Sequence, residues 1–471
     1  MTDYSDATDT GSTRPGPEVF RDEDDNLNPL WIEALRAELD QNAVAEVVER
    51  IEPLHASDVG DLLEALEPDE RFHFIQLLGS HFDYSALTEV DENVRAELME
   101  ALPSADIARG VAELDSDDAV YILEDIEAVD REAILAQLPA FDRLSLKRSL
   151  DFPEESAGRR MQTEYIAIPP YYTVGQTIDY MRSEKDLPED FYQLYVVDPG
   201  YQLLGIIPLD KFLRSKRDVR IEDLMNRNVI TVGATEDQEE AARDFERYDL
   251  VEVGVVDDNG RMVGVLTVDD IVDVINEEAT EDIKRMGGVG DEELSDRLIA
   301  TVKSRAPWLL VNLISALIVS FIISLFNGTI EQMVALAALM PIVASMGGNA
   351  ATQTMTVTVR ALATRDLDRG RVRRLIVREM SGGFLNGCLF AVLIGCITWV
   401  RYLNPGLGVV IGLAMIINMI AAGTAGILLP LLLNKLKIDP AIASSVFVTT
   451  VTDVVGFFAF LGIAGLWFGL F

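Results

Sequence analysis

The chain has 471 residues, of which 49% are hydrophobic and 25% are charged, and its formal net charge is −39. Residues 301–471 hold 12 Lys and Arg against 6 Asp and Glu, which leaves 27 against 72 for residues 1–300. A region so acidic repels nucleic acid and attracts cations, so we exclude nucleic acid as a partner. Arg outnumbers Lys by 31 to 8, and adaptation to a salt-rich host stays open as a second cause of the acidity.

Soft metal ligands are scarce in this sequence. The two cysteines, Cys388 and Cys396, lie in one apolar segment, and the three histidines, His55, His73 and His81, lie far from them along the chain. Neither a disulfide framework nor a zinc or copper site is therefore expected, which leaves metals with oxygen ligands. The chain also has no P-loop and no nucleophile–base arrangement, so we predict that it is not an enzyme.

The N-terminal part predicts a tail followed by a stack of helices. Residues 1–28 are polar and acidic, which predicts a disordered tail and no signal peptide. Within residues 29–155 an aliphatic residue recurs at intervals of 12, from Leu54 to Leu150, and most copies are followed by polar or turn residues. Short capped helices explain this spacing. We expect an all-α, superhelical N-domain.

A second repeat follows the N-domain. The segment Tyr195–Asp210 matches Gly254–Asp269 at a constant offset, and each reads as strand, turn, strand and then helix. This pattern resembles a tandem pair of CBS domains, which we place at residues 156–221 and 222–276. The resemblance implies an α/β fold for both copies.

The same resemblance implies ATP as a ligand of the pair. CBS pairs often bind adenine nucleotides through a Thr or Ser and an Asp after the last strand, and Thr267 and Asp270 fit that pattern in the second copy. The first copy has Pro208 and Lys211 at these places. Nucleotide binding at Thr267 and Asp270 therefore stays open.

A run dense in carboxylates connects the CBS pair to the apolar part of the chain, and it ends at Gly287 and Gly288. We assign residues 277–303 to a connecting, plug-like helix and linker. An acidic helix is usually only solvated, and a metal-binding gate is the second interpretation of this one. The candidate gating carboxylates on the run are Asp269, Asp270, Glu277, Glu278, Glu281 and Asp282.

Residues 304–471 predict an α-helical transmembrane domain with five spans, so the lipid bilayer is an expected partner. The spans cover roughly residues 306–326, 331–359, 381–400, 407–433 and 440–470. Basic residues gather before span one, between spans two and three, and between spans four and five. The positive-inside rule then places the N-terminal domains in the cytoplasm and the C-terminus outside. We expect a multi-pass protein of the plasma membrane.

Asp453 is the one acidic residue in the apolar stretch that ends the chain. A carboxylate at bilayer depth costs at least about 2.5–3.5 kcal/mol and usually faces a cavity, a partner or an ion path. Ser445, Thr449, Thr452 and Gly456 share its helical face. A lone carboxylate among hydroxyl groups suits a hard, hydrated cation. The alternative is a buried Asp that neighbouring hydroxyl groups satisfy.

Span two carries a polar face of its own, which suits a helix that lines a path. The residues of this face are Ser345, Gly348, Asn349, Thr352, Gln353 and Thr356. Gly347 and Gly348 permit either a close approach of two backbones or a break in the helix that frees carbonyl groups. The alternative is ordinary packing of small residues between helices.

From about residue 30 to its end, the chain resembles the MgtE family of magnesium channels and transporters. The segments that carry this resemblance are Phe152–Tyr165, Glu278–Ile283, Pro341–Gln353, Arg360–Asp368 and Asp439–Gly456.

The resemblance implies a homodimer whose pore lies on the two-fold axis and is lined by spans two and five. It implies that Asp453 holds a hydrated Mg²⁺, and that cytoplasmic Mg²⁺ bound between the N-terminal, CBS and connecting regions closes the pore. Ser445 and Thr352 stand where relatives can carry an Asn. The resulting pore candidates are Asp453, Thr449, Ser445, Asn349, Thr352 and Thr356, and Asp439 joins the gating carboxylates.

The predicted function is Mg²⁺-selective influx, with Mg²⁺ both as the transported and as the regulatory ion. A broader transporter that also carries Mn²⁺ or Co²⁺ is the first alternative, because oxygen ligands bind all three ions. The second alternative is a membrane-anchored CBS sensor that transports nothing.

Overall fold

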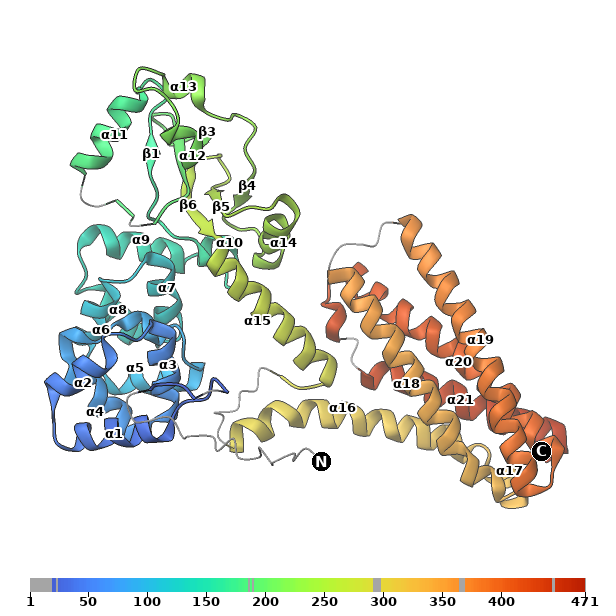
Figure 1. Ribbon diagram of the computed structural model, residues 1–471. Helices are drawn as coiled ribbons and strands as arrows, with labels where there is room; N and C mark the ends of the chain where they lie inside the picture. Colours follow the sequence, from blue (N-terminus) through green and yellow to red (C-terminus); the bar gives the residue numbers. More distant parts are fainter. Residues whose placement is uncertain are drawn as a thin grey trace, which may run out of the picture. The chain divides into compact units, whose positions relative to one another are not determined.

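The computed structural model describes residues 19–22, 24–184, 187–188, 190–290, 298–363, 369–442 and 445–470. The chain divides into two compact units, Met1–Val274 and Ile275–Phe471 (Figure 1).

The first unit begins with a stack of short helices. They are α1 (Pro29–Asp40), α2 (Val44–Ile51), α3 (Ala56–Ala65), α4 (Pro68–Leu78), η1 (Gly79–His81), η2 (Tyr84–Leu87), α5 (Glu92–Ala101), α6 (Ser104–Val111), α7 (Ser116–Glu124), α8 (Ala128–Leu135) and α9 (Ala140–Leu150). The aliphatic residues spaced by 12 are buried in, or packed against, one continuous core, as Leu66, Leu78 and Leu102 show. Their spacing therefore reflects one core contact per helix, and the predicted all-α stack is confirmed.

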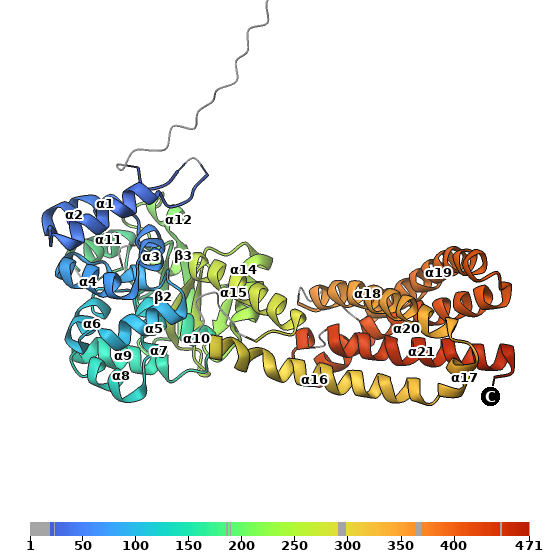
Figure 2. The ribbon, with the colours of Figure 1, turned by 90° about the horizontal axis from the view of Figure 1, so that it is seen from below.

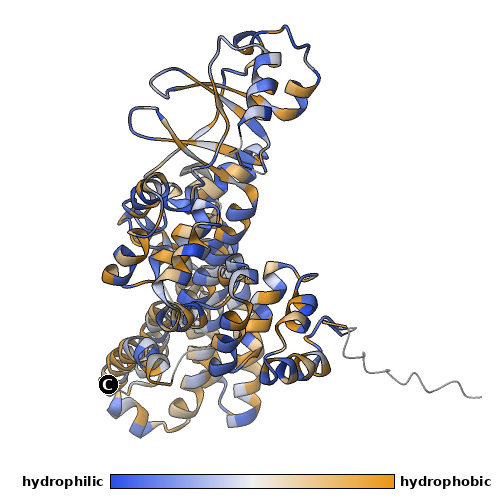
Figure 3. Cartoon of the chain, turned by 90° about the vertical axis from the view of Figure 1, so that its left-hand side faces the viewer, coloured by the Kyte–Doolittle hydropathy of each residue, from blue (hydrophilic) through white to orange (hydrophobic). Residues whose placement is uncertain are grey.

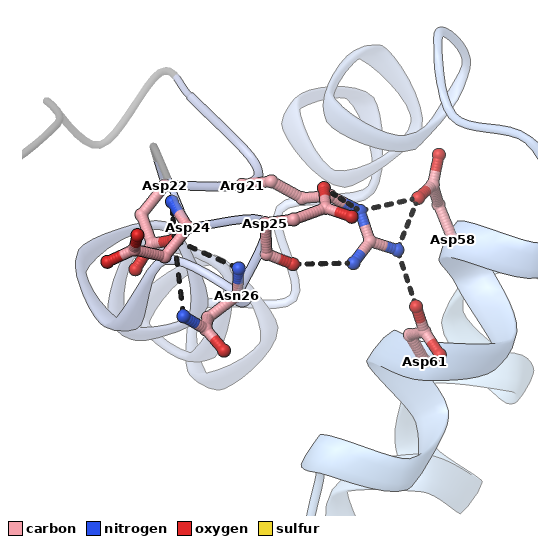
Figure 4. Close-up of polar contacts among 7 residues, drawn as sticks. All are labelled: Arg21, Asp22, Asp24, Asp25, Asn26, Asp58 and Asp61. Atoms are coloured by element: carbon pink, nitrogen blue, oxygen red, sulfur yellow. Dashed lines mark hydrogen bonds and ion pairs between the residues drawn. The ribbon is translucent and has the colours of Figure 1, made fainter.

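The last part of the predicted tail is attached to this stack. The Arg21 guanidinium donates hydrogen bonds to Asp58 Oδ1 at 2.7 Å and to Asp61 Oδ2 at 2.5 Å, both on α3 (Figure 4). The described residues between 19 and 28 thus have a defined position, in contrast to the disorder predicted for 1–28. Residues 1–18 lie outside the described part of the chain.

Two small sheets follow, connected to the stack through α10 (Ala157–Arg160). Their strands are β1 (Ala167–Ile168), β2 (Gln193–Val197) and β3 (Leu203–Pro208), then β4 (Thr231–Gly233), β5 (Glu252–Val256) and β6 (Met262–Thr267). In each sheet the first strand is parallel to the second, and the second is antiparallel to the third. The register of the second sheet repeats that of the first, with a bulge at the equivalent place. The tandem α/β repeat is confirmed.

The two copies exchange short segments. Gln162, which precedes the first sheet, pairs with Val265 in β6, and Asn226, which precedes the second sheet, pairs with Ile206 in β3. The helices around the sheets are α11 (Val174–Ser183), α12 (Leu209–Leu213), α13 (Ile221–Leu224) and α14 (Gln238–Tyr248). A domain boundary placed at a single position of the sequence therefore separates residues whose backbones pair with each other.

Helix α15 (Val268–Gly287) continues directly from β6, so it begins earlier than the connecting helix predicted at 277–303. Residues 291–297 of that predicted segment lie outside the described residues, and the next helix already begins at Leu298.

The second unit is helical and largely apolar (Figures 2 and 3). Its helices are α16 (Leu298–Ser324), α17 (Asn327–Gln332), α18 (Ala335–Ala363), α19 (Arg369–Tyr402), α20 (Pro405–Lys435), η3 (Pro440–Ile442) and α21 (Ser445–Phe468). Among the described residues, five of these helices are long and apolar enough to cross a membrane. Helix α20 packs against α18, α19 and α21 and supplies much of the buried core. The predicted five-span domain is confirmed.

The packing of the N-domain generates a stability prediction at Gly110 in α6. A methyl group added there would lie 2.2 Å from Cγ of the Tyr84 ring, so Gly110→Ala overpacks the core. We expect it to lower the free energy of unfolding by about 1–3 kcal/mol and the unfolding temperature by several degrees. Differential scanning calorimetry of the purified protein measures this. Gly382→Ala in α19 is the control, because nothing lies within 4 Å of its new methyl group, and an equal effect of both substitutions would contradict the prediction.

Candidate cation site

Asp453 lies in the middle of the apolar helix α21, and its side chain is half-buried. Helix α21 forms because its residues are apolar or small and its apolar side chains, such as Phe460 and Leu461, are fully buried against the bundle. Among the residues that the structure describes, no hydrogen bond or ion pair joins the Asp453 carboxylate to another side chain. A carboxylate in this setting requires compensation from water, a cation or a second chain.

The hydroxyl groups next to Asp453 are directed toward their own helix. Thr452 is fully buried and its Oγ1 donates to the carbonyl oxygen of Thr449 at 2.9 Å. Thr449 Oγ1 donates to the carbonyl oxygen of Val446 at 3.1 Å. These contacts disfavour the alternative prediction in which neighbouring hydroxyl groups satisfy Asp453. Ser445 is the first residue of α21, and its side chain lies outside the described part of the structure.

Helix α18 brings the second polar surface to α21. A methyl group added at Gly348 would lie 3.1 Å from Thr449 Cγ2, so the two helices approach closely at the level of Thr449. Helix α18 is continuous through Gly347 and Gly348, which agrees with the close-approach alternative and not with the alternative of a helix break. Gly347 and Gly348 therefore make room for neighbouring helices and do not expose carbonyl groups to a path.

The described residues cover the predicted polar face of α18 only in part, since Gly348 packs against α21 and is buried. Asn349 and Thr356 are exposed and Thr352 is half-buried, and Thr356 Oγ1 donates to the carbonyl oxygen of Thr352 at 3.0 Å. In the described part of the chain, no group of three or more His, Cys, Asp or Glu residues lies close enough to hold a metal ion. The arrangement therefore offers one carboxylate and several neutral oxygen atoms, which suits an ion that keeps its own water.

A second group of acidic residues lies in the first unit, where α7 of the N-domain meets the start of α15. The carboxyl groups of Asp117 and Asp270 lie close to each other, and burial raises the pKa of both above the ordinary value. Burial and the nearby Asp270 raise the pKa of Asp118 to about 7. Burial also raises the pKa of Asp273, with Glu89 and Asp269 adding to the shift.

Sequence reasoning found Asp269 and Asp270 but missed their partners Asp117, Asp118 and Asp273. The two N-domain residues follow a repeat position, Leu114, and we interpreted them only as part of a helix start. Nothing in the local sequence indicates that this helix start lies against α15, because the contact joins segments about 150 residues apart.

At the other end of α15, a cation from the chain itself engages two predicted gating residues. The Arg285 guanidinium pairs with Glu281 on the same helix and with Asp439, which precedes α21. Asp439 Oδ1 also accepts the backbone N–H of Ala441 at 2.8 Å. The remaining predicted residues, Glu277, Glu278 and Asp282, are half-buried along α15.

The predicted nucleotide-binding pair is also adjacent in space. Thr267 Oγ1 donates to Asp270 Oδ2 at 2.6 Å, and Thr267 is buried. In the first copy, Lys211 Nζ donates to the carbonyl oxygen of Leu224 at 2.5 Å. Because Asp270 also contacts Asp117, the same carboxylate takes part in two predicted sites.

Comparison with known proteins agrees with this arrangement. Three family models match: MgtE intracellular N domain over residues 54–155, CBS domain over 221–277, and the divalent cation transporter MgtE over 340–463. "Magnesium transporter MgtE" of Bacillus subtilis is 31% identical over 415 residues, which is 88% of this chain and 92% of that protein. The Thermus thermophilus protein of the same name is 32% identical over 441 residues, 92% of this chain and 97% of its own length.

A solved structure described as the cytosolic domain of the Mg²⁺ channel MgtE in complex with ATP is 28% identical to this chain. It covers 52% of this chain and 99% of its own, with a TM-score of 0.48. The sequence relatives match over most of their own length as well as most of this one, from the helical stack through the apolar helices. The chain therefore belongs to the MgtE family of divalent cation transporters.

Proposed function

We propose that this protein is a Mg²⁺-selective channel or transporter that admits Mg²⁺ across the plasma membrane. The observation that carries the proposal is Asp453, a half-buried carboxylate in an apolar membrane helix with no side-chain partner in the described chain. The polar face of α18 adjoins it through the Gly348–Thr449 contact. The names of the relatives, which are magnesium transporters, support Mg²⁺ as the ion.

Mg²⁺ is well suited to such a path because it sheds water reluctantly and is usually bound through one or two carboxylates. Asp453 supplies the charge, and neutral oxygen atoms contact the water shell of the ion. The residues that we assign to this second role are Ser445, Thr449, Asn349, Thr352 and Thr356. Mn²⁺ and Co²⁺ use the same ligands, so a broader divalent transporter is the second candidate.

A homodimer would enclose the proposed cation path, because a second copy would cover the exposed polar face of α18. The exposed amide of Asn349 would meet lipid in a single chain, where unsatisfied polar groups are costly. A second copy related by a two-fold axis would enclose these faces and bring two Asp453 carboxylates to one water-filled path. We assign the N-terminal domains to the cytoplasm and the C-terminus to the outside, and we assign no enzymatic step to any residue.

We further propose that cytoplasmic Mg²⁺ closes the pore by binding the acidic residues around α15. The carboxyl groups of Asp117 and Asp270 lie close to each other, and burial raises the pKa of both, so neutralisation of their charge is favourable. A divalent cation would supply that neutralisation and hold α7 against the start of α15. Asp118 and Asp269 lie near this pair and add negative charge, and the ion would keep water at its other coordination positions because no three described carboxylates lie close enough to hold it together. Glu277, Glu278 and Asp282 lie further along α15, toward the Arg285, Glu281 and Asp439 ion pairs.

ATP is a second proposed cytoplasmic ligand. Thr267 and Asp270 have the residue types that the CBS resemblance implies, and a hydrogen bond between them holds them together. Because Asp270 also takes part in the acidic group, occupation by ATP and by Mg²⁺ would be linked.

The pore assignment predicts that Asp453→Asn abolishes Mg²⁺ influx. Without its carboxylate the path loses the charge that compensates partial dehydration of the ion, and we expect influx to fall at least about 100-fold. Liposomes that contain a Mg²⁺-sensitive dye measure the influx. Glu331→Gln is the control on the same unit, because Glu331 is an exposed acidic residue on α17, outside α21 and the polar face of α18. Equal influx through wild type and a folded Asp453→Asn variant would remove Asp453 from the path.

The gating assignment predicts that a double variant, Asp117→Asn with Asp270→Asn, is less sensitive to closure by cytoplasmic Mg²⁺. Removing both charges weakens Mg²⁺ binding at the start of α15, so the Mg²⁺ concentration that halves the influx should rise roughly tenfold or more. The same liposome assay, with Mg²⁺ varied on the cytoplasmic side, measures it. Glu100→Gln, at an exposed position of α5, is the matched control. An unchanged half-inhibition concentration in the double variant would contradict the assignment.

The raised pKa of Asp118 predicts a pH-dependent stability in Mg²⁺-free buffer. The native state holds its proton up to about pH 7, whereas the unfolded chain releases it near the usual value of 3.8. Native protein therefore binds more protons in this window, and the free energy of unfolding falls as pH rises through it. Asp118→Asn should flatten this slope and raise the unfolding temperature at pH 7.5 by a few degrees. Thermal unfolding of both proteins and of Glu100→Gln, from pH 5 to 7.5, tests this, and parallel slopes for all three would contradict it.

A further inference from the structure

Asn418 is a fully buried polar residue in α20 that contacts both helices of the proposed path. Its Nδ2 donates a hydrogen bond to the carbonyl oxygen of Val343 in α18 at 2.8 Å. A methyl group added at Gly347 would lie 2.1 Å from Nδ2, and one added at Gly456 would lie 2.8 Å from it. The amide therefore fills the space that glycines on α18 and α21 leave open.

The contacts of Asn418 lie at the level of the proposed cation site. Gly347 precedes Gly348, which packs against Thr449. Gly456 follows Asp453 by less than one helical turn, so its position is fixed together with that of the carboxylate. Any change in the size or bonding of Asn418 thus acts on the distance between α18 and α21 beside Asp453.

The free-energy cost of burying the Asn418 amide argues against a role that consists only of filling space. Asn418 Oδ1 is buried and has no hydrogen-bond partner among the described residues. An aliphatic side chain of similar size would fill the same space without an unsatisfied oxygen atom, and cores tolerate such exchanges well. What the aliphatic side chain would lose is the directional bond from α20 to the α18 backbone.

We propose that Asn418 is a positioning residue of the cation path. Its hydrogen bond to Val343 and its fit against Gly347 and Gly456 set the spacing between α18 and α21. That spacing determines which hydrated cation fits between Asp453 and the polar face of α18. This inference rests on the proposed function, in which Asp453 lies on the path.

The test compares Asn418→Leu with wild type in liposomes, with Mg²⁺ and Ca²⁺ influx measured separately. Ca²⁺ is larger, accepts more ligands and dehydrates more readily, so its share of influx reports on the spacing. We expect the Mg²⁺-to-Ca²⁺ influx ratio to change by about fivefold or more. Thr398→Val is the matched control, because Thr398 is another buried polar residue with an unpartnered oxygen atom, on α19, and it should leave the ratio unchanged. An unchanged ratio in folded Asn418→Leu would overturn the inference.

If Asn418→Leu does not fold, two compensating changes of side-chain size at Gly347 and Asn418 test the inference instead. Gly347→Ala alone should abolish influx because its methyl group overlaps the amide, and Gly347→Ala with Asn418→Ala should restore influx with an altered ion ratio. Failure of the double variant to restore influx, or restoration with the wild-type ratio, would count against a positioning role.

Asp453→Asn in the same assay separates the two ideas. If its influx is lost while the Asn418 variants keep the wild-type ratio, the pore assignment stands and the inference on Asn418 falls. If Asp453→Asn still conducts, the proposed path itself is wrong.

Discussion

The structure of the membrane unit depends on one electrostatic constraint, the placement of a carboxylate in an apolar helix. Asp453 costs several kcal/mol at bilayer depth unless water, a cation or another chain compensates it. The neighbouring elements fit that requirement: Gly348 lets α18 approach α21, and the exposed amide of Asn349 lies on the polar face of α18. Helix α20 supports both helices from behind with a buried core. A site so poor in protein ligands favours an ion that remains hydrated.

The same electrostatic principle operates in the cytoplasmic part. Carboxylates gather where α7 meets the start of α15, and burial, together with the neighbouring carboxylates, raises the pKa of Asp117, Asp118 and Asp270, which favours bound protons or cations. At the end of α15 the chain provides its own cation, since Arg285 pairs with Asp439. One helix thus carries both a group of carboxylates that favours a cation and an ion pair that is already satisfied.

The sequence predicted those features that local pattern determines. The aliphatic spacing predicted the helical stack, the internal repeat predicted two equivalent sheets, and the apolar runs predicted five spans. Contacts between distant segments were not predictable, because no local signal marks them. Asp117 meets Asp270 and Arg285 meets Asp439 only after folding. Gly347 was compatible with a helix break until the structure showed the Asn418 side chain in its place.

The most direct test of the central claim is whether the path recognises a hydrated cation. Hexaamminecobalt(III) has the size of a hydrated divalent ion but cannot shed its ligands, so a site that holds Mg²⁺ through its water shell should bind it and not pass it. We expect it to inhibit Mg²⁺ influx into liposomes, and rising Mg²⁺ on the same side should relieve the inhibition. Influx that is unaffected by this complex would contradict the account, because it would mean that Mg²⁺ passes without a site for its water shell.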